Sequence, residues 1–301
     1  MLFIPVFILL FHSAVSFRWV TFHIPCIRLT QDRNLSRILA DVSTSSMPRD
    51  MTNLLIIFGV VLLTSTLSGV LGMAGGLVLM AVLLGLLPVP GAMLLHGATQ
   101  AMANGSRAWL LRKHIAWGIM PPYVAGSAFA TMLFVMLRIV PDTNIVLIMV
   151  GSFPWLARAS FLIRGPKLGG LDVTRPWTAA ICGALVTPAQ LLAGASGPLL
   201  DVFYVHATLD RHQIVATKAL TQTLGHVIKS TYYLALFTNA ATKDISPTVV
   251  AGSLVAAWIG TRIGTLLLAR MSDGQFRNAS QMLILAVGSF CIIEGMYGLV
   301  W

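Results

Sequence analysis

The sequence contains little charge of either sign. Asp, Glu, Lys and Arg together make up 10% of its 301 residues, against about 25% in an ordinary soluble domain. Hydrophobic residues make up 56% of the chain, and the mean hydropathy is +0.83. A soluble fold of this length could not bury so much apolar surface. The composition therefore excludes a soluble globular enzyme and a disordered chain, and it predicts an all-α, polytopic transmembrane bundle.

Several motifs are also missing. The three cysteines form no CxxC pair and there is no His-rich tract, so we expect no structural disulfide, no metal site and no cofactor. No GxxxxGK[ST] phosphate loop occurs, which argues against ATP-driven transport by this chain alone. The formal net charge is +10, but the basic residues fall mostly between apolar runs. That pattern indicates membrane topology and no nucleic-acid partner.

Residues 1–52 differ from the rest of the chain. An apolar run ends at Phe17, which is short for a membrane span, and a polar, arginine-containing stretch follows. Three interpretations remain open: a weak additional helix, a targeting segment, or untranslated sequence ahead of a start at Met47 or Met51. We therefore leave residues 1–52 out of the fold prediction.

Eight apolar segments follow, and a bilayer-spanning helix takes about 20 such residues. Two of the segments are too long and too rich in glycine to be single straight helices, and Pro188 is expected to interrupt the second of them. The segments are 53–87, 92–111, 115–137, 144–163, 177–206, 213–238, 247–269 and 282–300.

The two glycine-interrupted segments occupy corresponding places in two halves of the chain, 53–168 and 169–301. LSGVLGMAGGLVLM at 67–80 corresponds to AQLLAGASGPLLDV at 189–202, and each precedes a helix with an Ala-Thr pair. The recurring order predicts an internal duplication. A broken helix exposes backbone N–H groups, which are tolerated at membrane depth only inside a protein-lined cavity and which attract anions. Paired breaks therefore indicate a transporter site.

Polar side chains form a stripe along the helix that follows each break. Spacings of three and four residues place such side chains on one helix face, and a polar face must meet the bundle interior or water. The stripes line a pathway or, as the alternative, form hydrogen bonds between helices without contacting substrate. They are His96, Gln100, Asn104 and Arg107 in the first half, and Lys218, Thr221, Gln222, His226 and Lys229 in the second.

Lys218 is the most informative polar residue. An ionised side chain at membrane depth costs about 2.5–3.5 kcal/mol, so Lys218 is predicted to bind an anion, unless it snorkels from the helix end to the interface. Asp201 could pair with Lys218, carry a coupling proton or lie at the interface. Glu294, the single glutamate, could shuttle a proton or be neutral and hydrogen-bonded. The remaining cations are interpreted as interfacial topology charges: Arg107, Lys113 and Lys229.

Basic residues are densest in two loops, one around Arg112 and Lys113 and one from Arg164 to Arg175. If each glycine-interrupted segment crosses the membrane once, both loops lie on one side, which the positive-inside rule makes cytoplasmic. Arg270 and Arg277 then fall on the opposite side. A re-entrant segment would change this parity, and the number of crossings therefore remains open.

These residues resemble a known family. The run from Gly69 to Gly76, with the Ala98-Thr99 helix, is similar to the TauE/SafE family of sulfite and organosulfonate exporters. The Gly194–Pro198 run, with Ala216-Thr217, matches the repeat of the same family pattern. The resemblance covers residues 53–301. Met73-Ala74 stands where the family usually has more glycine.

The resemblance implies a multi-pass inner-membrane transporter that exports sulfite, an organosulfonate or a short carboxylate. Its partners would be this small anion and the lipid bilayer, and a homo-oligomer remains open. We predict that the anion binds between the two breaks and that one half rocks against the other to alternate access. The predicted substrate-binding residues are Gly75, Gly76, Thr99, Gln100, Ser196, Gly197, Thr217 and Lys218, with Asp201 or Glu294 as candidate coupling residues.

Two other functions remain open. Gly194-Ala195-Ser196-Gly197 also reads as GxSG, the nucleophile motif of rhomboid intramembrane proteases, with Ser196 as nucleophile and His226 as base. The corresponding first-half site has no serine, which favours a duplicated helix break, and we therefore do not expect an enzyme. A passive anion channel is the other alternative, and counterflow exchange separates a carrier from a channel.

Overall fold

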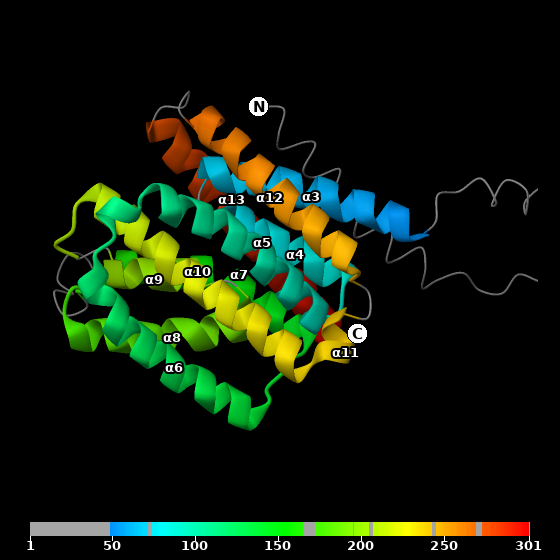
Figure 1. Cartoon of the computed structure of the whole chain (residues 1–301), viewed down its shortest axis with the longest axis horizontal. Helices are drawn as coiled ribbons and strands as arrows, with labels where there is room; N and C mark the ends of the chain where they lie inside the picture. The colour runs from blue at the N-terminus through cyan, green and yellow to red at the C-terminus, as the bar shows by residue number, and fades with distance from the viewer. Residues whose placement is uncertain are drawn as a thin grey trace, which may run out of the picture.

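The computed structural model describes residues 49–71, 74–164, 172–194, 196–204, 207–242, 245–268 and 273–300. Within these ranges every regular element is a helix, which confirms the all-α prediction (Figure 1). Of the N-terminal segment 1–52, residues 1–48 lie outside the described residues, and so do the interpretations that concern them. The first described helix begins at Arg49, so the boundary expected at residue 53 falls inside it.

The helices follow the order of the predicted apolar segments. Those of the first half are α3 (Arg49–Leu71), α4 (Ala74–Leu86), α5 (Val89–Leu110), η1 (Arg112–His114), η2 (Trp117–Ile119), α6 (Met120–Leu137) and α7 (Thr143–Arg164). Those of the second half are α8 (Pro176–Ala193), α9 (Gly197–Tyr204), α10 (Arg211–Leu236), α11 (Thr238–Thr242), α12 (Pro247–Leu268) and α13 (Asp273–Val300).

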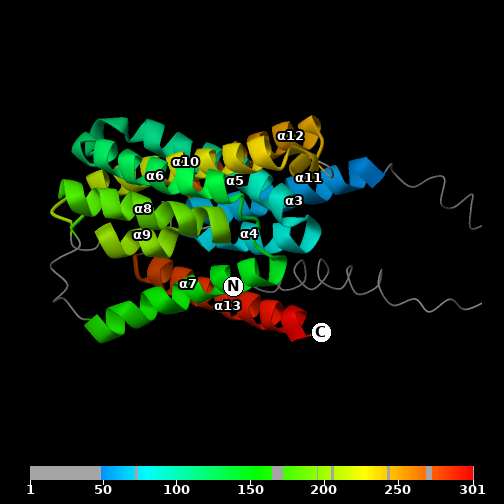
Figure 2. The ribbon, with the colours of Figure 1, turned by 90° about the horizontal axis from the view of Figure 1, so that it is seen from below.

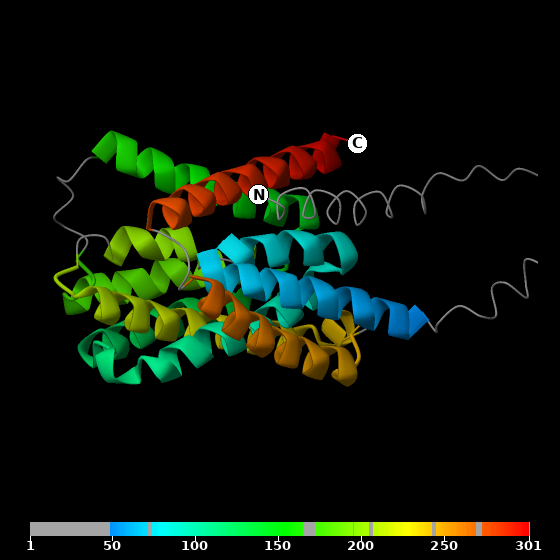
Figure 3. The same ribbon diagram turned by 90° about the horizontal axis from the view of Figure 1, so that it is seen from above.

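The first predicted break is a reversal of chain direction. Gly75, at the start of α4, lies directly against the backbone of Ser68 and Thr64. α4 therefore returns along α3 and does not continue it (Figure 3). No side chain larger than hydrogen fits between the two backbones at this point, which accounts for glycine at position 75.

The second break is also a reversal. Gly194 ends α8 in the left-handed region, at φ +72°, where glycine is favoured. The backbone N–H of Val173, just before α8, donates to the carbonyl of Phe203 near the end of α9 at 3.3 Å, so α9 returns along α8. α8 runs through Pro188 without interruption, which corrects the expectation for that residue. A proline inside a membrane helix is tolerated where neighbouring helices compensate for the lost hydrogen bond.

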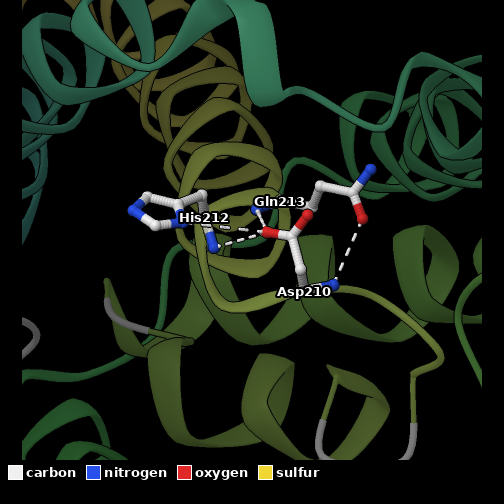
Figure 4. A network of polar contacts seen from close by, with 3 residues as sticks. All are labelled: Asp210, His212 and Gln213. Carbon is white, nitrogen blue, oxygen red and sulfur yellow. Dashed lines mark hydrogen bonds and ion pairs between the residues drawn. The ribbon is translucent and has the colours of Figure 1, made fainter.

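The start of α10 is fixed by a capping box (Figure 4). The Asp210 carboxylate accepts hydrogen bonds from the backbone N–H groups of His212 and Gln213 at 2.8 and 2.9 Å. In return, the Gln213 side-chain oxygen accepts from the Asp210 backbone N–H at 3.2 Å. These bonds satisfy donors that have no partner within the helix. They also lower the pKa of Asp210, the bond from Gln213 foremost, and the charges of His212 and His114 add to this effect.

The helices form three layers (Figure 2). α12, α5, α10 and α6 form one outer layer, the two hairpins α3–α4 and α8–α9 lie in the middle, and α7 crosses α13 in the other outer layer. The most extensive packing joins α3 to α12, α5 to α10, α6 to α8 and α7 to α13. Glycines permit close backbone contact in these pairs, as where Gly69 of α3 meets Gly264 of α12.

The short helix α4 lies inside the bundle. Its residues from Leu77 to Leu84 are all buried, and they form the centre of the largest apolar core. A helix that is apolar on every side is stable only when it is covered all round. α4 therefore carries the first chain reversal, and with it Gly76, into the interior of the protein.

Among the described residues, three helices are long and apolar enough to cross a membrane on their own: Trp117–Leu137, Pro176–Ala193 and Pro247–Leu267. Shorter apolar stretches are Leu55–Val70, Gly75–Leu86, Thr143–Leu156 and Leu285–Val300. α5 and α10 belong to neither group because polar side chains interrupt their apolar sequence. These two helices carry most of the buried polar side chains discussed below.

Candidate functional site

A continuous chain of polar contacts joins the two chain reversals. The Lys229 ammonium of α10 donates to the carbonyl oxygen of Gly194, at the second reversal, at 2.8 Å. It also contacts His96 Nδ1 of α5 at 2.7 Å, and His96 Nε2 contacts the carbonyl oxygen of Gly76, at the first reversal, at 2.8 Å. Two side chains from two different helices therefore connect the two predicted breaks.

The partners of His96 determine where its ring proton lies. A carbonyl oxygen can only accept, so Nε2 carries the proton and donates it to Gly76. Nδ1 then accepts from the Lys229 ammonium, as a neutral imidazole does. The ammonium has three N–H groups, and two of them are directed to His96 and Gly194.

Gln190 of α8 organises the other side of the same cluster. Its side-chain amide nitrogen contacts the Gly194 carbonyl at 3.1 Å and His226 Nδ1 at 2.8 Å. Its side-chain oxygen accepts a hydrogen bond of 2.5 Å from the Ser196 hydroxyl. The Gln190 amide therefore contacts Gly194, Ser196 and His226 at once. These contacts hold Ser196 and His226 in place beside the second reversal.

Lys229 is 0% exposed. Among the described residues the ion pairs are His212 with Asp210 and Lys218 with Asp201, so Lys229 has no carboxylate partner there. A buried cation without a counter-charge is costly, and a bound anion would offset that cost. The arrangement is therefore suited to hold a small anion, and the polar hydrogens of the cluster are suited to orient it.

Gln100 adds an amide to this cluster. It lies on the His96 face of α5, 3% exposed, and its side-chain oxygen would lie 3.1 Å from a methyl group on Gly76. Its amide nitrogen Nε2 has no hydrogen-bond partner within the described part of the protein. Asn104, one turn further, donates to the Gln100 backbone carbonyl at 3.0 Å. An unsatisfied buried amide is costly in a folded protein, so this nitrogen is available to donate to a ligand.

The structure separates the predicted substrate-binding residues into two groups. Gly76, Gln100 and Ser196 lie at the Lys229 cluster, and Gly197 follows as the first residue of α9. The other four have different surroundings. Gly75 packs on α3, the Thr99 hydroxyl donates within α5 to Leu95 and His96, Thr217 accepts from the backbone N–H of Ala116, and Lys218 pairs with Asp201.

The two candidate coupling residues also lie apart. Asp201 of α9 contacts Lys218 through its carboxylate. Glu294 is half-buried on α13, in the helical layer formed by α7 and α13, away from α5 and α10. Of the two, Asp201 is the one in contact with a polar stripe.

Lys229 is the residue whose position differs most clearly from the one predicted from the sequence. It was expected as a topology charge at the membrane interface, and it is instead fully buried at the contact of the two reversals. The signal that could have identified it is its position eleven residues after Lys218, about three helical turns, which places both on one face of α10. Gln190 could also have been identified from the sequence, because it is a polar residue one turn before Gly194.

Ser196 does not form the pair that a serine protease requires. Such a mechanism needs the serine hydroxyl within hydrogen-bond reach of the base. In the structure the hydroxyl donates to Gln190, and it is Gln190 that contacts His226. The motif therefore supplies a polar hydrogen at the second reversal, and the geometry does not favour the rhomboid alternative.

Comparison with known families identifies the chain's family. The model of the family described as Sulfite exporter TauE/SafE matches residues 57–291, which is most of the chain and includes every residue of the Lys229 cluster. No curated protein and no solved structure matches the chain.

Proposed function

The chain belongs to the TauE/SafE family of sulfite exporters, and on this premise we propose that it carries sulfite, an organosulfonate or a short carboxylate outward across the inner membrane. The anion binds between the two chain reversals, against Lys229, Gln100 and the cluster around Gln190. Outward movement of one negative charge across 100 mV of membrane potential, negative inside, releases about 2.3 kcal/mol. The potential alone therefore drives export.

The observation that carries this proposal is the position of Lys229. Its ammonium bridges Gly194 and, through His96, Gly76, and it does so without any carboxylate among the described residues. One ammonium N–H and the Gln100 amide remain for the oxygens of an anion. Because both reversals contribute to this site, a relative movement of the two reversals would open or close it.

The packing of the helices supports an internal duplication. In chain order, α3, α4, α5, α6 and α7 correspond to α8, α9, α10, α12 and α13. Exchanging each helix for its counterpart turns the α3–α12 pair into α8–α6, and both pairs are extensive. The same exchange leaves the pairs α5–α10 and α7–α13 unchanged. Two repeats related by a pseudo-twofold axis produce this pattern.

The same pairs suggest which units move. α3 packs on α12 and α6 packs on α8, so each extensive pair takes one helix from each half of the chain. Rocking of one half against the other, as the sequence suggested, would separate both pairs. We instead assign alternating access to the movement of these mixed pairs around α5 and α10, which hold the site.

The orientation follows from the two reversals. The end of α12 at Leu268 and the start of α13 at Asp273 lie at the same end of the bundle as the link from α5 to α6, with Arg112 and Lys113 (Figure 1). Under the positive-inside rule this end is cytoplasmic.

Counterflow in proteoliposomes tests the proposal. Vesicles loaded with unlabelled sulfite, a sulfonate or a short carboxylate should transiently concentrate the labelled anion when wild-type protein is present. Lys229→Met removes the ammonium and keeps an unbranched apolar side chain, so counterflow should fall to the level of protein-free vesicles. Lys113→Met removes an exposed lysine of η1 and is the matched control, which should retain the wild-type rate.

The contrary results are distinct. Wild-type rates in Lys229→Met would remove Lys229 from the site. Entry of labelled anion without counterflow would indicate a passive channel. No exchange of any anion by wild-type protein would refute the proposed substrate class and leave the family assignment unchanged.

A further inference from the structure

α5 and α10 face each other through two layers of nitrogen-bearing side chains. The helices are antiparallel, because Gly97 lies against Ser230, and a methyl group added at Gly105 would lie 3.4 Å from the Thr223 methyl. His96 and Arg107 are eleven residues apart on α5, and so are Lys218 and Lys229 on α10. Eleven residues are about three turns, or about 16 Å along the axis, so each pair shares one helix face. We call His96 with Lys229 the inner layer, and Arg107 with Lys218 the outer layer. These two names refer to side chains and not to the layers of helices in Figure 2.

The outer layer is nearer to the protein surface. The Lys218 side chain is 18% exposed and its Asp201 partner 34% exposed, whereas Lys229 is 0% exposed. The outer layer also lies toward the end of the bundle that carries Arg112 and the start of α10 (Figure 1). It is therefore placed between one end of the protein and the inner layer.

The outer layer holds two cations and one carboxylate. Lys218 forms its ion pair with Asp201 of α9. The antiparallel register of α5 and α10 places Arg107 at the level of Lys218, and the Arg107 charge acts on that of Lys218. The hydrogen bond that the structure gives the Arg107 guanidinium is a long one, 3.4 Å to the carbonyl of Ser68. A guanidinium has five N–H donors and matches an oxyanion with two of them at once.

The stripe of α5 connects the layers. Gln100 and Asn104 lie between His96 and Arg107 on the same face, 3% and 7% exposed, and the Asn104 amide reaches the Gln100 backbone. The unpartnered Gln100 amide nitrogen lies on this face as well. Polar side chains therefore occupy the α5 face between Arg107 and His96.

We propose that Arg107 and Lys218 form a second, outer binding site for the transported oxyanion, and that Asp201 occupies this site until the anion displaces it. This inference rests on the proposed function, since it uses the same anion. Displacement exchanges one anionic partner of Lys218 for another, so neither cation is left buried and unpaired during entry. At the cytoplasmic end of an exporter, such a site collects the anion and delivers it along α5.

The test separates delivery from final binding. Initial rates of labelled sulfite uptake are measured in proteoliposomes at low sulfite, and equilibrium binding of labelled sulfite is measured on the purified protein in detergent. Lys218→Gln and Arg107→Gln should each lower the initial rate about tenfold, as expected when charges that attract an ion are removed. Their affinity at the inner site should stay within about twofold of wild type, because Lys229 is intact.

Asp201→Asn gives the opposite result. It leaves Lys218 and Arg107 without their internal carboxylate, so the purified protein should bind a second equivalent of sulfite, and uptake at low sulfite should be faster than in wild type. Lys218→Arg keeps the charge and should restore the rate that Lys218→Gln loses. Lys113→Gln removes an exposed lysine near the same end of the bundle and should change neither rate nor stoichiometry.

Three results would overturn the outer site. They are wild-type rates in both Lys218→Gln and Arg107→Gln, a loss of inner-site affinity in Lys218→Gln as large as in Lys229→Met, and a rate in Asp201→Asn as low as in Lys218→Gln. The last would make the ion pair a structural contact only. Failure of the proposed function is recognised separately, because wild-type protein would then neither bind nor exchange sulfite.

Discussion

The imidazole rings of His96 and His226 lie with their centroids 5.4 Å apart and their planes inclined by 55°. Each ring has a partner outside α5 and α10: His96 contacts the carbonyl of Gly76, and His226 contacts the amide of Gln190. The two rings therefore link α5 and α10 to α4 and α8, respectively. A movement that separates the hairpins from α5 and α10 has to break or exchange these two contacts.

Gln190→Met should lower both stability and transport. Methionine has nearly the same length but no amide, so His226 Nδ1 loses its donor and the Ser196 hydroxyl loses its acceptor. Each buried group left without a partner costs about 1–3 kcal/mol. We expect a lower melting temperature in detergent and a counterflow rate reduced by about tenfold or more.

Ser196→Ala is the matched control for Gln190→Met. It removes one hydroxyl and leaves the contacts of Gln190 with Gly194 and His226 in place. Loss of one neutral hydrogen bond costs about 1 kcal/mol, so counterflow should remain within about fivefold of wild type. If Ser196→Ala abolished a proteolytic activity of the wild-type protein, the rhomboid alternative would have to be reinstated.

Gly97→Ala should force α5 and α10 apart. A methyl group at this position would overlap the Ser230 hydroxyl and lie 3.1 Å from both the His226 carbonyl oxygen and the Lys229 Cε atom. Overpacking of this kind costs about 1–3 kcal/mol, and here it also displaces Lys229. The melting temperature and sulfite affinity should both fall. Gly85→Ala, where a methyl group meets open space, should leave both unchanged or raise the melting temperature.

Gly194→Ala should destabilise the second reversal. The residue has φ +72°, and a methyl group would lie 2.8 Å from the sulfur of Met80 and 3.0 Å from that of Met93. Backbone strain of a left-handed alanine adds about 1 kcal/mol or more to this contact. We expect a lower melting temperature together with weaker sulfite binding, because the Gly194 carbonyl orients Lys229 and Gln190. Unchanged affinity in a folded Gly194→Ala protein would contradict this role.

Asp210 should make stability depend on pH in the acidic range. Its pKa is lowered in the folded protein, first by the hydrogen bond from Gln213, so its carboxylate stabilises the fold at neutral pH. That contribution is present above the ordinary aspartate pKa of about 3.9 and is lost as the pH falls through the lower folded value. The difference in melting temperature between wild type and Asp210→Ala should therefore be constant from about pH 8 to pH 5 and shrink below about pH 4.

Asp210→Asn separates capping from charge. Asparagine is also a good N-cap residue, so this variant should keep most of the wild-type melting temperature at pH 7. Its melting temperature relative to Asp210→Ala should not change between pH 5 and the acidic limit of the measurement. A wild-type protein that shows no such change either would refute the assigned role of the carboxylate.

The helices could be located from the sequence because long apolar runs leave few alternatives. The start of α12 at Pro247 and the end of α6 at Leu137 are as the hydropathy predicted. The direction of the chain after each break could not be predicted. Glycine at 75 and 194 shows that a helix can end or be approached closely, but the return of α4 along α3 depends on tertiary contacts.

The candidate site was less accessible to sequence reasoning. Lys218 and Lys229 have the same residue type on one face of one apolar helix, so hydropathy cannot rank them. Only the packing of α5 and α8 against α10 decides that Lys229 is covered and Lys218 partly exposed. Ser196 could be identified because it adjoins the second glycine run, and Gln100 because it lies on the polar stripe of the helix that follows the first run. Gln190 becomes informative only once the reversal brings His226 and Gly194 to its amide.

The mixed pairs α3–α12 and α6–α8 also affect how the protein is made. α3 is synthesised and inserted long before α12 exists, so its glycine-lined face, including Gly69, first meets lipid or the insertion machinery. Its native partner, α12, is synthesised only after α5, α8 and α10 have been inserted. Such distant pairings are slow to form and expose incomplete intermediates. For the same reason, the two halves synthesised as separate chains should recognise and complete each other in the membrane.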